Sequence, residues 1–145
     1  MAKTNIPKLE NFPFSTILKL RITDINYGGH LGNDALLGLL HEARLQFLNT
    51  YGKATEMDCC GAGLIMLNIQ VDYKAEGRYS DEIEIFVAIK DVGKTQFDMV
   101  YQLINVKNQK VVANAVSTMA FFDYKRHRVV RRPANFIENF QLENS

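Results

Sequence analysis

The sequence predicts an α+β fold in which one long helix is wrapped by a curved antiparallel sheet of about five strands. Apolar residues recur with the helical period of about 3.6 in one long segment, residues 33–51, and with the strand period of two in five other segments. The connections at residues 91–94 and 107–110 are short, so the strands that they join should be antiparallel neighbours. A sheet with one apolar face and a helix with one apolar stripe cover each other when the sheet curves around the helix.

The first predicted strand, residues 16–22, precedes a glycine-bearing loop and the long helix. Its apolar side chains alternate with charged ones, which is typical of a half-buried strand. In the helix, Asn33 or Asp34 fits the N-cap position, and Gly52 lies where a C-terminal glycine is common. The apolar stripe of the helix consists of Leu36, Leu39, Leu40, Ala43 and Phe47.

Further strands follow the helix, and a short helix ends the chain. The strands are predicted over residues 67–74, 83–89, 97–103 and 111–122. Pro133 fits the first position of a short terminal helix at residues 133–140. Such a sheet leaves two edges open, and pairing with a second copy would cover one of them, so we expect a homo-oligomer, either a dimer or a tetramer.

The composition is that of a single globular domain over residues 1–145. Lys and Arg number 17 and Asp and Glu number 16, so the net charge of +1 gives no reason to expect nucleic acid as a partner. No apolar run is long enough for a membrane span, and the first residues lack the apolar core of a signal peptide, which favours a cytoplasmic protein. The adjacent Cys59 and Cys60 predict neither a disulfide nor a metal site, and we expect no metal and no cofactor.

Three stretches carry a resemblance to a known family. They are RITDINYGGHLGN at residues 21–33, LLHEARLQFL at 39–48, and VDYKA followed by YSDEIEI at 71–85. Together they resemble the hotdog-fold thioesterases, specifically the 4-hydroxybenzoyl-CoA thioesterase and acyl-CoA thioesterase group, over roughly residues 14–135. The resemblance implies hydrolysis of an acyl thioester, carried by coenzyme A or by an acyl carrier, to a free acid and a thiol.

The first loop departs from the pattern of many members of that family. Their loop reads Asp-x-Asp before the glycines, and the second acid serves as base or nucleophile, whereas here the second position is Asn26. The set Asp24, Asn26 and His30 looks more like the Asp-x-Asn-x-His pattern of the plant acyl-ACP thioesterases, with two more residues before the histidine. A non-catalytic hotdog protein that binds an acyl thioester or another small ligand is therefore the alternative function.

These three side chains are the predicted catalytic residues. Thioester hydrolysis needs an activated water or a nucleophile, together with donors for the oxygen that becomes negative. Asp24 could take a proton or orient a group, Asn26 could position water or the carbonyl, and His30 has an intrinsic pKa suited to proton transfer. The alternative is that Asp24 and Asn26 only cap the loop by side-chain to backbone bonds, and that His30 is a plain loop residue.

Tyr27, Gly28 and Gly29 are the predicted oxyanion and substrate-binding residues. Glycines let the backbone approach a substrate closely, and free N–H groups at a helix start favour negative charge. On its own, the glycine pair indicates only a turn.

Two charged residues of the helix also bear on the site. Glu42 lies away from the main apolar stripe, and some hotdog enzymes place a catalytic acid on this helix, although a solvated or interface role is the more common one for such a residue. Arg44 falls on the apolar arc, where it could snorkel or pair with Asp24 or Glu42, and we favour a structural ion pair.

A run of basic residues near the end of the chain is the predicted landing site for the phosphates of coenzyme A. Its predicted phosphate contacts are Arg126, Arg128 and Arg131, with Lys74 and Arg78 as further candidates. The alternative is a solvated segment after the last strand.

Overall fold

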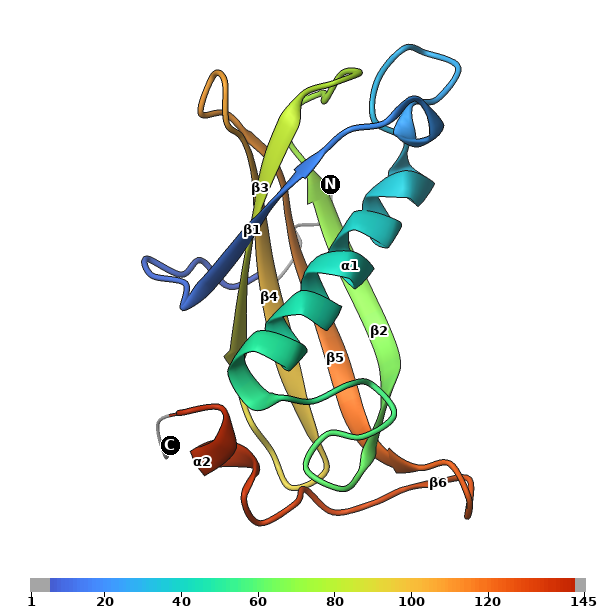
Figure 1. Ribbon diagram of the computed structural model, residues 1–145, viewed down its shortest axis with the longest axis vertical. Helices are drawn as coiled ribbons and strands as arrows, with labels where there is room; N and C mark the ends of the chain where they lie inside the picture. Colours follow the sequence, from blue (N-terminus) through green and yellow to red (C-terminus); the bar gives the residue numbers. More distant parts are fainter. Residues whose placement is uncertain (1–5, 143–145) are drawn as a thin grey trace.

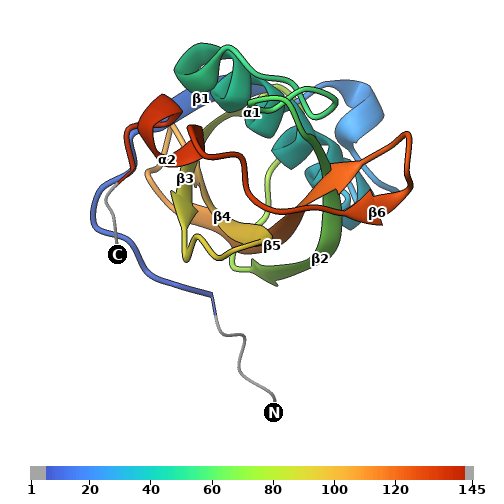
Figure 2. The same cartoon turned by 90° about the horizontal axis from the view of Figure 1, so that it is seen from below.

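The computed structural model describes residues 6–142 and places one long helix across the concave face of a six-stranded sheet (Figure 1). In chain order the elements are β1 (Phe14–Lys19), the 3₁₀ turn η1 (Ile22–Asp24), α1 (Asn33–Gly52), β2 (Gly63–Tyr73), β3 (Glu82–Lys90), β4 (Gln96–Asn105), β5 (Val111–Asp123), β6 (Arg128–Val129) and α2 (Phe136–Asn139). Figure 2 shows the strands curving around α1, from β1 on one side to β2 on the other. The predicted fold class is confirmed.

The strands lie in the order β1-β3-β4-β5-β2, and every neighbouring pair is antiparallel. The pairs β3–β4 and β4–β5, predicted from their short connections, are confirmed, while β6 pairs with the end of β5. β2 pairs with β5 from Gly63 opposite Phe122 to Tyr73 opposite Ala113. Within the described residues no strand lies on the other side of β2, so β2 is an open edge of the sheet.

The core lies between α1 and the concave face of the sheet. Every member of the predicted apolar stripe of α1 is buried, and Leu48 joins it. The largest fully buried side chains include Phe47 of α1 together with Phe97, Tyr101 and Phe121 of the sheet. None of the helices in the described part of the chain is long and apolar enough to cross a membrane.

The first strand ends earlier than predicted. β1 stops at Lys19, and the chain then turns into η1, because the Asp24 carboxylate accepts a hydrogen bond from the Arg21 amide. Leu20 is still buried, but Ile22, two residues further along the predicted strand, is 68% exposed. The alternation of residue types continued past the point where the backbone stopped being extended.

Both ends of α1 also differ from the prediction. The N-cap is Gly32, and Asn33 is already helical, with its Oδ1 accepting a hydrogen bond from the Asp34 amide at 3.0 Å. At the other end the left-handed residue is Lys53, with φ of 49°, and Gly52 is the last helical residue.

Gly52 is required by packing instead. A Cβ atom there would overlap the ring of Phe140. That ring stacks on Phe47, which lies in α1 like Gly52. The terminal helix α2 is shorter than the predicted residues 133–140, because Pro133 precedes it and Phe140 follows its last residue.

Candidate active site

A cavity of about 820 Å³ lies at the N-terminal end of α1, between the first loop and the segment that follows β2. Five residues that the sequence predicted for the site line it together: Asp24, Asn26, Tyr27, His30 and Lys74. The other predicted site residues, Gly28, Gly29, Arg78, Arg126, Arg128 and Arg131, do not line it. The volume is in the range of small-molecule sites.

Asp24 is held rigidly at the end of η1. Its side chain is 8% exposed, its Oδ2 accepts a hydrogen bond from the Arg21 amide at 2.8 Å, and the Arg21 Nε lies 3.5 Å from the same oxygen. The Asp24 carbonyl accepts a hydrogen bond from the Gly32 amide at 3.0 Å, which ties η1 to the start of α1. No hydrogen bond from the described residues reaches Oδ1, so this oxygen is left for a water molecule or a substrate in the cavity.

Asn26 organises the glycine turn. Its Oδ1 accepts a hydrogen bond from the Gly28 amide at 2.9 Å, and its carbonyl accepts one from Gly29 at 3.1 Å. The capping alternative therefore describes real bonds of both Asp24 and Asn26. Because the two glycine N–H groups are used inside the loop, their role as oxyanion donors stays a prediction.

Unbonded N–H donors do lie in the cavity wall, at the start of α1. Within the described residues the amides of Asn33 and Ala35 have no acceptor, and both residues line the cavity. The first amides of a helix lack partners inside the helix, and the helix dipole makes this end favourable for negative charge. The amides of Asn33 and Ala35 are therefore the candidate oxyanion donors at the helix start, in place of the amides of the predicted glycines.

His30 lies beside an acid that the sequence analysis missed. Its Nε2 is 3.8 Å from Glu76 Oε1, and the side chain is only partly exposed. Glu76 reaches the first loop because the Leu31 amide donates to the Gly77 carbonyl at 2.7 Å, which fixes the segment after β2 against the loop. No local pattern could have joined the two, since the contact depends on where β2 ends in space.

The candidate coenzyme A residues divide into two groups. Lys74 lines the cavity, with its Nζ 2.9 Å from Asp72, and Arg78 bonds Glu76 at 3.0 Å. The basic segment, residues 125–132, instead lies at the far end of the sheet, because Val129 pairs opposite Phe122 and Phe122 opposite Gly63, at the start of β2 (Figure 1). The cavity lies at the other end of β2, about 30 Å away at roughly 3.3 Å per residue.

A turn between β5 and β6 presents this basic segment. The Asp123 carboxylate accepts hydrogen bonds from the Lys125 amide at 2.9 Å and the Arg126 amide at 3.1 Å. These backbone bonds, above all that of Arg126, lower the pKa of Asp123. The Asp123 carboxylate is thus occupied by hydrogen bonds within the turn. Arg128 and Arg131 have no ion-pair partner among the described residues.

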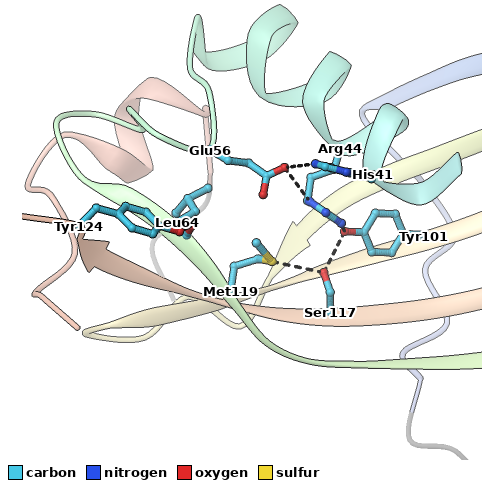
Figure 3. Close-up of polar contacts among 8 residues, drawn as sticks. All are labelled: His41, Arg44, Glu56, Leu64, Tyr101, Ser117, Met119 and Tyr124. Carbon is cyan, nitrogen blue, oxygen red and sulfur yellow. Dashed lines mark hydrogen bonds and ion pairs between the residues drawn. The ribbon is translucent and has the colours of Figure 1, made fainter. Parts of the chain in front are cut away.

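Arg44 is buried in a polar chain that crosses the core (Figure 3). Its Nη1 donates to the Tyr101 hydroxyl at 3.2 Å, and that hydroxyl lies 2.8 Å from Ser117 Oγ. On the other side, Arg44 Nε lies 3.6 Å and His41 Nε2 lies 2.8 Å from Glu56 Oε1. Burial raises the pKa of Tyr101, so its phenol stays protonated.

The predicted ion pair of Arg44 is confirmed, but its predicted partners are wrong. The partner is Glu56, which comes from the loop after α1 and is anchored by its carbonyl accepting the Leu64 amide at 2.7 Å. Glu42 is exposed and accepts a hydrogen bond from Gln46 one turn along the helix, at 2.7 Å. Glu42 thus occupies the solvated position that we favoured.

The two cysteines are free thiols, as expected. Cys59 is fully buried, and burial raises its pKa to about 12. Burial also raises the pKa of Cys60. Both thiols are therefore protonated near neutral pH, which argues against a nucleophilic role.

Comparisons with known proteins bear on the family and on the fold. A family model described as the thioesterase-like superfamily matches residues 20–140. No curated protein sequence matches the chain significantly.

Several solved structures share the fold. A 1,4-dihydroxy-2-naphthoyl-CoA thioesterase from Synechocystis is 14% identical, with a TM-score of 0.78 over 88% of this chain and 95% of that one. A thioesterase from Thermus thermophilus, complexed with coenzyme A and zinc, is 19% identical, with a TM-score of 0.77 over 90% and 99%. A probable thioesterase from Escherichia coli is 18% identical, with a TM-score of 0.70 over 88% and 96%.

Proposed function

The chain belongs to the thioesterase-like superfamily and has its hotdog fold, and from this premise we propose that it hydrolyses the thioester bond of an acyl-CoA to a free acid and coenzyme A. One observation carries the proposal. A single cavity joins a buried carboxylate, Asp24, to unbonded N–H groups at the positive end of α1. These are the two requirements of thioester hydrolysis, a proton acceptor and donors for the developing oxyanion.

In the proposed mechanism Asp24 is the base. Its Oδ1 takes a proton from a water molecule as the water oxygen attacks the thioester carbon. The amides of Asn33 and Ala35 stabilise the negative charge on the carbonyl oxygen. When the tetrahedral intermediate collapses, the carbon–sulfur bond breaks and the protonated Asp24 returns the proton to the leaving thiolate. His30, with Glu76 beside it, is the second candidate for that last transfer.

Asn26 supports one alternative, a non-catalytic protein that binds an acyl thioester. The amide stands where many family members have an acid, and its oxygen is occupied by Gly28. Release of free thiol from a panel of acyl-CoAs separates the two functions, because only the enzyme produces it.

The open edge of β2 favours a dimer in which each site is shared. If β2 pairs antiparallel with β2 of a second copy, the start of one β2 lies beside the end of the other. The basic segment of one copy would then approach the cavity of its partner, although it lies at the far end of the sheet from its own. Phosphates of a coenzyme A bound in the cavity would meet these arginines across the interface.

We expect the triple variant Arg126→Ala, Arg128→Ala, Arg131→Ala to raise KM for acyl-CoA and to leave kcat nearly unchanged. Contacts to the distant phosphates bind substrate and transition state alike. The effect should shrink as salt rises, since exposed charges are screened over about 10 Å at 0.1 M. An acyl-N-acetylcysteamine thioester, which lacks the nucleotide, is the control substrate and should be cleaved as by the wild type. Equal losses on both substrates would assign the segment to the fold or the interface.

We also expect light scattering at micromolar concentration to give at least twice the chain mass of 16.5 kDa.

A hybrid experiment then tests whether the site is shared. A dimer of one Asp24→Asn chain and one chain with the triple arginine change would hold one wild-type site, made of Asp24 from the second chain and the arginines of the first. At low acyl-CoA concentration the mixture should exceed the activity of either variant alone. A mixture no better than its components would contradict the shared site.

A further inference from the structure

A second groove opens beside the active-site cavity, between β1 and α1. Its volume is about 620 Å³, and it shares Thr23, Asp24, Asp34 and Ala35 with the cavity. The two spaces therefore meet at Asp24. From there the groove follows α1 as far as Glu42, about 10 Å at 1.5 Å per residue.

The walls of this groove change character along its depth. Leu18 of β1 and Leu39 of α1 contribute apolar side chains, and the charged residues that line the groove besides Asp24 are Lys19, Arg21, Asp34 and Glu42. These four are exposed, whereas Leu39 is buried, so their charges belong to the rim and the apolar atoms to the floor. A long apolar group starting at Asp24 would find its apolar surface along this floor.

Gly38 lies in the wall of the groove and in the middle of α1. Glycine inside a helix destabilises it relative to alanine, so a reason for its presence is needed. The chain itself supplies none, because a Cβ built on Gly38 meets no atom within 4 Å, in contrast to Gly52, where it would overlap Phe140. The space next to Gly38 is therefore free for a ligand or for another molecule.

We propose that this groove holds the acyl chain of the thioester and that Gly38 sets the room available to it. The inference rests on the proposed function, since it takes the thioester carbonyl to lie at Asp24. An acyl chain is the occupant that fits, because the groove begins at the reacting group and its floor is apolar. Gly38 is then a specificity-determining residue for the length of the acyl chain.

The variant Gly38→Leu tests this assignment with acetyl-CoA and decanoyl-CoA. A side chain placed in the groove should lower kcat/KM for decanoyl-CoA about 10- to 100-fold, the range that a misfit in an apolar pocket produces. Acetyl-CoA, which is too short to reach Gly38, should be cleaved within about twofold of the wild type. Asn49→Leu adds the same side chain to an exposed position of α1 outside every described pocket and should change neither substrate. Gly38→Ala should melt at a higher temperature than the wild type, which shows that the helix accepts a side chain there.

Three outcomes would overturn the assignment. They are unchanged cleavage of decanoyl-CoA by Gly38→Leu, an equal loss on both substrates, or a Gly38→Leu variant that is monomeric in light scattering while the wild type is oligomeric, which would make Gly38 a contact between copies. If the wild type cleaves no acyl-CoA at all, the proposed function fails by itself, and binding of S-decyl-coenzyme A, a stable thioether, tests the groove separately. Weaker binding by Gly38→Leu than by Asn49→Leu would then support the groove, and equal binding would overturn it.

Discussion

Replacing Asp24 with asparagine should lower kcat for acyl-CoA hydrolysis by about 100-fold or more, the usual cost of removing a general base. Asparagine keeps an oxygen that can accept the hydrogen bond of the Arg21 amide, so η1 should persist. The carboxylate that takes the proton is lost. The measurement is steady-state thiol release, together with the unfolding midpoint of the variant.

Asp98→Asn is the matched control. Asp98 lies on the outer face of the sheet, where its Oδ1 accepts a hydrogen bond from Thr118 at 2.8 Å, and its change to an amide should leave kcat unaltered. Full activity in folded Asp24→Asn would remove Asp24 from the mechanism. A loss found only in Asn26→Ala would move the positioning of water to Asn26.

Replacing Arg44 with methionine should lower the free energy of unfolding by about 3 kcal/mol, the range for breaking a buried ion pair from one side. The change removes the donor to the Tyr101 hydroxyl, and of the described residues it leaves His41 alone paired with Glu56. Urea unfolding measures the loss, and an unchanged m-value shows that the shift in midpoint is a change in stability.

A double-mutant cycle separates the ion pair from the packing of the side chain. Glu56→Gln removes the charge of the partner, whose side chain is 25% exposed, and should cost less than Arg44→Met. If Arg44 and Glu56 act as a pair, the two losses should not add in the double variant. Additive losses, or a loss below about 1 kcal/mol for Arg44→Met, would contradict a stabilising pair.

The fold was predictable from sequence because its signals are local. The helical period of α1 and the alternation in β3 and β4 each lie within one element, and the short turns between strands determine antiparallel neighbours. The errors lie where a hydrogen bond overrides the pattern. Asp24 caps Arg21 and ends the extended chain before Ile22, and Lys53, not Gly52, takes the left-handed conformation.

The site was predictable only as far as its residues are close in sequence. Asp24, Asn26 and His30 lie close together in the chain, so the short motif that identifies them also places them in one cavity. Glu76 reaches His30 through the contact of two loops, and the basic segment lies far from the cavity because of the register of β2 and β5. Those relations come from the sheet and have no signature in a single segment.

Hydrolysis of acyl-CoA by this chain can be measured by incubating the wild type with acyl-CoAs of several lengths in ¹⁸O-labelled water. We expect one free thiol for each acyl group released, and a free acid that carries one labelled oxygen. We also expect Asp24→Asn to slow the formation of both products together. Acyl-CoA that binds but yields neither free thiol nor labelled acid would refute hydrolysis and leave the chain as a protein that only binds acyl thioesters.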